Sequence, residues 1–132
     1  MGKRILLATL GVFLLWSALD FVIHGIILRP VYETTASLWR PMAQMKMGLM
    51  YLTVLISALM FVLIYSRLVD RRNPGTGLKY GLLFGIGVGV GMGYGTYSVM
   101  PIPYSMALTW FLGVVVEASL GGFLLGMLFR EK

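Results

Sequence analysis

The sequence predicts an all-α integral membrane four-helix bundle over residues 1–132, with helices running antiparallel, up and down, and both termini in the cytoplasm. Of the 132 residues, 58% are hydrophobic and only 12% are charged, whereas a soluble domain usually carries about 25% charged residues. The mean hydropathy is +0.86. Four apolar stretches each have the roughly 20 residues that a helix needs to cross the hydrocarbon core. Such a chain cannot cover its surface with polar groups, so the predicted solvent is lipid.

The first two predicted spans are residues 5–28 and 42–68. Basic residues ahead of the first span are also typical of a secretory signal. However, the apolar run exceeds the usual h-region of about 7–15 residues, and no A-x-A cleavage site follows it. We therefore expect a retained membrane helix. Two Arg-Pro pairs, beginning at Arg29 and Arg40, bracket the connection between the spans, because the residue before a proline disfavours helix.

The last two predicted spans are residues 78–100 and 104–129. The charged and polar run at residues 70–75 separates them from the second span, because such a sequence cannot lie in lipid. Pro101 and Pro103 leave only a short connection between the last two spans. These two helices are therefore expected to form an antiparallel hairpin.

The distribution of Lys and Arg predicts the orientation, because cytoplasmic connections carry an excess of them. The two ends of the chain and the second connection hold eight of the eleven basic residues. The other three, Arg29, Arg40 and Lys46, lie on the opposite side. We therefore expect both termini in the cytoplasm and the protein in the bacterial cytoplasmic (inner) membrane.

Glycines recur at four-residue spacing in the third predicted span and again near the end of the fourth, a spacing that places them on one helix face. In lipid, small residues let two backbones approach closely and gain van der Waals contact. The residues expected to mediate this packing are Gly81, Gly85, Gly89, Gly93, Gly122 and Gly126. A second row, Gly87, Gly91 and Gly95, indicates a second packing partner, with a homo-oligomer and a larger membrane complex both open.

Ionisable side chains are costly in hydrocarbon unless they are paired or hydrated. At about 1.5 Å per residue, Asp20 lies about 22 Å and Glu117 about 20 Å from the cytoplasmic side, with His24 at about 28 Å. We expect an outward-open, hydrated pocket for a cation, a proton or a small polar solute, lined by Asp20, His24, Lys46, Tyr51, Tyr94 and Glu117. The alternative is a carboxylate paired with His24 or Lys46 that only fixes helix register.

Methionine is concentrated in the predicted outer half of the membrane. Thioethers are soft ligands suited to Cu(I), so a metal ion is the one cofactor left open, with candidate ligands His24, Met47, Met50 and Met92. Methionine is also a flexible apolar filler, which is the structural interpretation of the same pattern. The chain has a single histidine, which excludes bis-histidine haem ligation within one chain.

Several functions find no support in the sequence. Cysteine is absent, which excludes disulfides and thiolate sites. The net charge of +6 comes from basic residues at the ends of apolar stretches, so membrane topology explains it and no nucleic-acid partner is expected. The glycine-rich span never completes G-x-G-x-x-G, because Tyr94 or Thr96 occupies the last position. No hydrolase, zinc-protease or nucleotide-binding motif is present either, so no enzymatic activity is assigned.

The segments at residues 19–25 and 38–42, and the Met-Gly-Tyr-Gly-Thr-Tyr run from Met92 to Tyr97, resemble those of uncharacterised small four-span bacterial membrane proteins. This resemblance covers most of the chain and implies the architecture without an activity. Three functions remain open: a binding or transport module, an accessory subunit of a larger membrane complex, and a methionine-rich copper-binding protein. The first is favoured, because carboxylates at mid-depth are hard to explain by packing alone.

Overall fold

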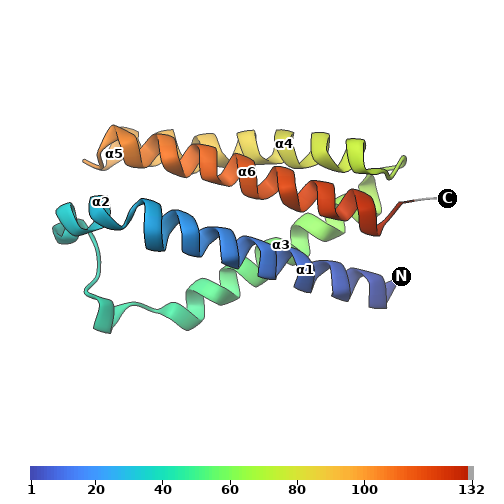
Figure 1. Ribbon diagram of the computed structural model, residues 1–132, viewed down its shortest axis with the longest axis horizontal. Helices are drawn as coiled ribbons and strands as arrows, with labels where there is room; N and C mark the ends of the chain where they lie inside the picture. Colours follow the sequence, from blue (N-terminus) through green and yellow to red (C-terminus); the bar gives the residue numbers. More distant parts are fainter. Residues whose placement is uncertain (131–132) are drawn as a thin grey trace.

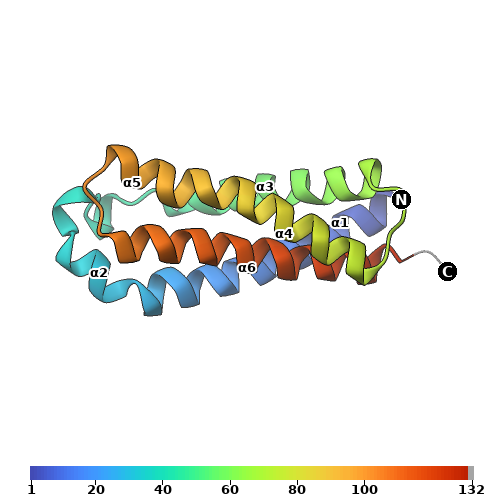
Figure 2. The same cartoon turned by 90° about the horizontal axis from the view of Figure 1, so that it is seen from above.

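The structure, a computed structural model, describes residues 1–130, which contain helices and no strand. Four helical segments are long and apolar enough to cross a membrane: Gly2–Ile27, Met47–Leu68, Pro74–Val99 and Tyr104–Leu128. Successive segments run in opposite directions, so the start of the first and the end of the last lie at the same end of the molecule (Figures 1 and 2). The predicted all-α class and the four membrane-length apolar helices are therefore confirmed.

The first segment consists of α1 (Gly2–Val22) and a π-helical turn (Ile23–Ile27). The N–H of Leu28 donates to the carbonyl oxygen of Ile23 at 2.8 Å, which closes the wider turn. A π-helical turn contains one more residue than an α-helical turn and often occurs at functional sites. The short helix α2 (Arg29–Thr34) follows, with a proline in its first turn, where the missing N–H costs nothing.

The second segment is α3 (Met47–Leu68), which begins later than residue 42, where the sequence placed its start. Met42–Gln44 instead forms a separate 3-10 turn, and Met45 is extended. Apolar composition alone extended the predicted span into this region, although Gln44 and Lys46 are polar. The buried residues of α3, including Ala58 and Tyr65, all lie in its second half.

The third segment consists of α4 (Pro74–Val90), a second π-helical turn (Gly91–Gly95) and α5 (Thr96–Val99). Asn73 caps α4, because its side-chain oxygen accepts from the N–H of Thr76 at 2.9 Å. The helix thus begins earlier than residue 78, at a typical Asn-Pro start signal. The last segment, α6 (Tyr104–Leu128), begins immediately after Pro103.

Helices α4 and α6 pack with their backbones in contact, which Figure 2 shows as two crossing ribbons. A Cβ atom added to Gly81 would overlap the carbonyl oxygen of Ala118, and one added to Gly85 would lie 2.8 Å from the Cα of Val115. The glycines of α4 and the following turn that face α6 are buried: Gly77, Gly81, Gly85, Gly89 and Gly93. From α6, Gly122 and Gly126 are buried against α4 and its preceding residues. By contrast, Gly87 and Gly91 have nothing within 4 Å of an added Cβ.

Candidate functional site

A cavity of about 410 Å³ lies between the helices, lined by residues of all four membrane-length segments. One apolar cluster borders it toward the termini, where Phe61, Tyr65 and Leu125 are fully buried. A smaller cluster around Met106 lies at the other end of the bundle, with Trp39 and Trp110 packed against it. From α3, the residues that line the cavity are Thr53, Val54, Ser57 and Met60.

Two carboxyl groups face this cavity from opposite helices, Asp20 from α1 and Glu117 from α6. The two groups interact electrostatically and through a side-chain hydrogen bond. Oε1 of Glu117 is buried and has no hydrogen-bond partner among the residues that the structure describes. A buried acceptor without a partner costs about 1–3 kcal/mol, so the Glu117 carboxyl is a source of instability unless something occupies the cavity beside it.

The indole of Trp16 holds α1 against α6 at the same level. Its Nε1 donates to the backbone carbonyl oxygen of Glu117 at 2.8 Å, and its ring lies 5.1 Å from the ring of Phe61 between centroids. The absence of a side chain at Gly121 makes this possible, because an added Cβ would lie 2.9 Å from Nε1 of Trp16. The helix pairing therefore also fixes the position of one aromatic wall of the cavity.

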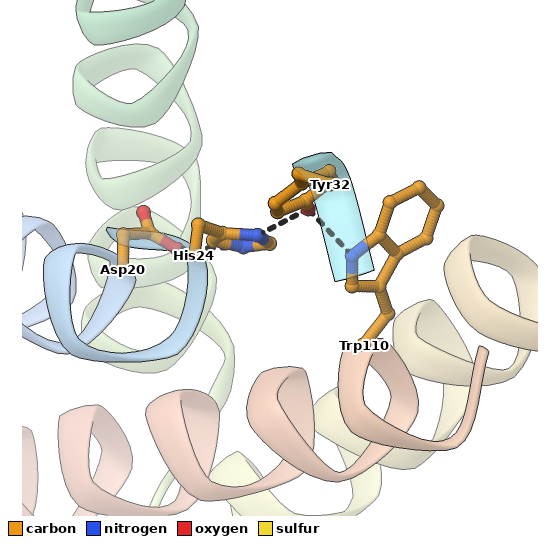
Figure 3. Close-up of polar contacts among 4 residues, drawn as sticks. All are labelled: Asp20, His24, Tyr32 and Trp110. Atoms are coloured by element: carbon orange, nitrogen blue, oxygen red, sulfur yellow. Dashed lines mark hydrogen bonds and ion pairs between the residues drawn. The ribbon is translucent and has the colours of Figure 1, made fainter. Parts of the chain in front are cut away.

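A chain of polar contacts connects Asp20 to the cluster around Met106, and Figure 3 shows its four side chains in a row. Nε2 of His24 lies 3.6 Å from Oδ1 of Asp20. Nδ1 of His24 lies 2.7 Å from the hydroxyl of Tyr32. The same hydroxyl oxygen accepts a hydrogen bond from Nε1 of Trp110 at 2.9 Å. Burial raises the pKa of Tyr32 above its ordinary value, so its hydroxyl keeps the proton that it can donate.

The hydrogen-bond donors along this row of side chains can all point from Trp110 toward Asp20. The indole of Trp110 can only donate, so it occupies an acceptor site of Tyr32 and leaves the hydroxyl proton free for Nδ1 of His24. The proton of a neutral His24 is then on Nε2, which faces Asp20. In this arrangement Trp110 and Tyr32 set the tautomer of His24, and the histidine presents a donor to the carboxylate without adding positive charge.

Tyr32 and Trp110 were not among the residues expected to form the site. Tyr32 lies on α2, which the sequence placed in the outer connection, and the ring of Trp39 packs edge-on against it at 5.4 Å between centroids. The ring of Trp39 also contacts that of Trp110, at 6.0 Å. Nothing in the sequence indicates that α2 folds back over the helix ends, so these contacts could not have been found by counting residues.

The structure brings three of the six expected pocket residues together: Asp20, His24 and Glu117 line the cavity. Lys46, Tyr51 and Tyr94 do not. Lys46 is exposed at the start of α3, and the ring of Tyr51 contacts that of Phe13. The hydroxyl of Tyr94 lies 3.0 Å from that of Tyr104. Counting residues placed all six in the outer half of the membrane, but it did not determine which way each helix face turns.

The candidate metal ligands are also divided. His24 and Met92 line the cavity, whereas Met47 and Met50 are exposed near the start of α3 and are not part of its lining. Across residues 1–130, no group of three or more His, Cys, Asp or Glu side chains could hold a metal ion. Of the four residues that the sequence combined into a copper site, two therefore line the cavity and two do not.

Replacing Gly121 by Ala is expected to displace the Trp16 indole from the Glu117 carbonyl oxygen. The added methyl group would lie 2.9 Å from Nε1 of Trp16 and 3.3 Å from Phe61. We expect stability to fall by about 1–3 kcal/mol, with a red shift of tryptophan emission as the indole loses its partner. Gly11→Ala is the control, because its Cβ would meet Leu124 at an ordinary 3.5 Å. Equal effects of the two variants would contradict this account.

Comparisons of this chain with protein-family models, with curated proteins and with solved structures gave no match. Its function is therefore argued from the cavity and the side chains that surround it.

Proposed function

We propose that this protein binds a cation in the cavity between Asp20 and Glu117, as a step in carrying it across the membrane. The observation that supports this most is the Glu117 carboxyl, whose buried Oε1 has no partner although it shares a cavity with a second carboxyl group. Among the described residues, no Lys or Arg lines that cavity. Carboxyl groups within the hydrocarbon depth need compensation, and a bound cation supplies it.

The proposed orientation places both termini in the cytoplasm and the cavity nearer the outer face. It rests on the excess of Lys and Arg at the end of the bundle that carries the termini. Four apolar helices of membrane length are compatible with this placement, and we propose the bacterial inner membrane as its location. A cation entering from outside would then meet the aromatic cluster around Trp39 and Trp110 before it reaches the carboxyl groups.

The experiment that tests this function is infrared difference spectroscopy of the purified protein in lipid, with exchange of the cation in the buffer. We expect Na⁺, K⁺ or an organic ammonium ion, exchanged at constant pH, to change the carboxyl bands of the unaltered chain. The change should be lost in Asp20→Asn and Glu117→Gln, because these amides keep the shape and remove the charge.

Glu33→Gln is the matched control. Glu33 is exposed on α2, where it pairs with Arg29 at 3.2 Å, and it does not line the cavity. Its substitution should leave the cation-dependent bands unchanged. The proposal fails if none of these cations changes the carboxyl bands, or if the bands respond equally in the Glu117→Gln protein.

A further inference from the structure

We infer that the cation bound in this cavity is an organic ammonium ion with an apolar body, an inference that rests on the proposed function. Its charged nitrogen would lie near Asp20 and Glu117, and its apolar body would contact the aromatic walls. Two observations support this inference: the volume of the cavity and the chemistry of the side chains that line it. Both differ from what a bare metal ion requires.

The cavity is too large for a dehydrated inorganic ion and has the size of a small-molecule site. Its volume of about 410 Å³ falls within the range of about 300–1,000 Å³ typical of such sites, which are mostly apolar with a few placed polar groups. That description fits this lining, where carboxyl groups of Asp20 and Glu117 stand among aromatic, aliphatic and thioether side chains. A ligand that fills the space must therefore bring apolar surface as well as charge.

The oxygen atoms around the cavity are few. Besides the two carboxyl groups, only the hydroxyls of Thr53 and Ser57 are side-chain oxygens in the lining. The backbone oxygen of Glu117 accepts from Trp16. Calcium takes six to eight oxygen ligands, and magnesium demands a near-ideal octahedron. Even with both carboxyl groups bidentate, a calcium ion here would need both hydroxyls to reach six protein oxygen ligands.

The aromatic walls suit an organic cation, because the face of an aromatic ring attracts positive charge. Trp16, Phe84 and Trp110 all line the cavity, and each is held by its own contacts. Trp16 donates to the Glu117 carbonyl oxygen, and Trp110 donates to the hydroxyl of Tyr32. The ring of Phe84 packs edge-on against that of Phe61 at 4.9 Å between centroids. Walls fixed in advance lower the cost of ordering the site around a ligand.

The histidine contact keeps the cavity suited to a cation. Trp110 donates to Tyr32, and Tyr32 can then donate to Nδ1 of His24, which places the proton of a neutral ring on Nε2, toward Asp20. A protonated imidazolium there would compete with the bound cation for the same carboxylate. Tyr32 and Trp110 thus act on the ligand indirectly, by positioning His24.

The test compares two probes of the same shape and different charge, benzyltrimethylammonium and its uncharged carbon analogue neopentylbenzene. Binding to the unaltered protein in detergent is followed through tryptophan fluorescence, because Trp16 and Trp110 line the cavity. We expect saturable binding of the ammonium ion, at least about 10-fold tighter than that of the neutral analogue, since only the former meets the carboxyl charge. This comparison needs no variant, so it does not depend on whether a substituted chain folds.

A pair of phenylalanine variants tests the aromatic wall. Phe84→Leu keeps an apolar side chain and removes a ring face, so affinity for benzyltrimethylammonium should fall about 3- to 30-fold. Phe123→Leu is the control, because Phe123 is exposed on α6 and does not line the cavity. Affinity for the ammonium ion should not change in this variant. Glu117→Gln should weaken ammonium binding, while the affinity of neopentylbenzene stays the same.

The outcomes separate this inference from the proposed function. Equal affinity for the two probes would overturn it, and so would ammonium binding that is unaffected by both Phe84→Leu and Glu117→Gln. If the infrared carboxyl bands respond to Na⁺ or K⁺ but benzyltrimethylammonium does not bind, the cation site stands and the organic ligand is wrong. If no cation changes those bands, both proposals fail.

Discussion

Replacing Gly81 by Ala is expected to break the α4–α6 pair. The added Cβ would overlap the carbonyl oxygen of Ala118 and approach the Cα of Ser119 to 2.9 Å. Both atoms belong to the backbone of α6, so no side-chain rotation can relieve the contact. Overpacking of a well-packed interior typically costs about 1–3 kcal/mol. We expect this change to reach or exceed the upper end of that range, measured by unfolding in mixed micelles with increasing dodecyl sulfate.

The same helix provides a control for this result in Gly87→Ala. No atom lies within 4 Å of a Cβ added at Gly87, and alanine favours helix over glycine by about 1 kcal/mol. The Gly87→Ala protein should therefore be as stable as the unaltered chain or more stable. Similar losses from the two substitutions would mean that glycine is required along α4 for backbone flexibility, and that contact with α6 is not the reason for the row.

This contrast shows how far the glycine pattern could be interpreted from sequence. Four-residue spacing identified two rows on the third span, and it predicted that α4 would pack on α6. The sequence assigns that packing to the row containing Gly81, although the other row has the same spacing and composition. The structure assigns that contact to the row containing Gly81, while Gly87 and Gly91 of the other row face open space in the single chain.

The residues that line the cavity could also be predicted only in part. Helix rise placed Asp20 and Glu117 at nearly the same depth, and the structure brings both to one cavity. The same count placed Tyr94 at that level, where its hydroxyl instead contacts Tyr104. The depth of a residue depends on one local quantity, the rise per residue. The direction in which its side chain points depends on the rotation of the helix about its axis. That rotation is set by packing across the whole bundle, and here by two π-helical turns that no periodicity predicted.

The contacts among Tyr32, Trp39 and Trp110 could not be predicted from the sequence. Tyr32 contacts Trp110 although 78 positions separate them, and the contact requires α2 to fold over the ends of α1 and α6. A connecting segment that contains both polar and aromatic residues is equally compatible with a position on the lipid headgroups. Pro30 favours the start of a helix in either arrangement, so only the tertiary structure distinguishes them.

Replacing Glu117 by Met is expected to stabilise the protein while abolishing cation binding. Methionine has a similar length and adapts to irregular interiors, and it removes the buried Oε1 that has no partner. Relief of an unsatisfied buried polar atom is worth about 1–3 kcal/mol. The unfolding free energy should therefore rise by about that amount in the absence of ligand, measured by the same dodecyl sulfate titration.

Glu33→Met separates this effect from a general benefit of replacing carboxylates in an apolar chain. Glu33 is exposed on α2 beside Arg29, where a surface ion pair contributes little, so its substitution should leave the unfolding midpoint unchanged. A loss of stability in Glu117→Met would contradict the proposed site, because it would show that the carboxyl holds α1 to α6 through Asp20 as a structural contact. A gain would mean that the bundle tolerates an unfavourable group at its centre. Packing alone would favour replacement of such a group, so a gain in stability supports a role of Glu117 in binding.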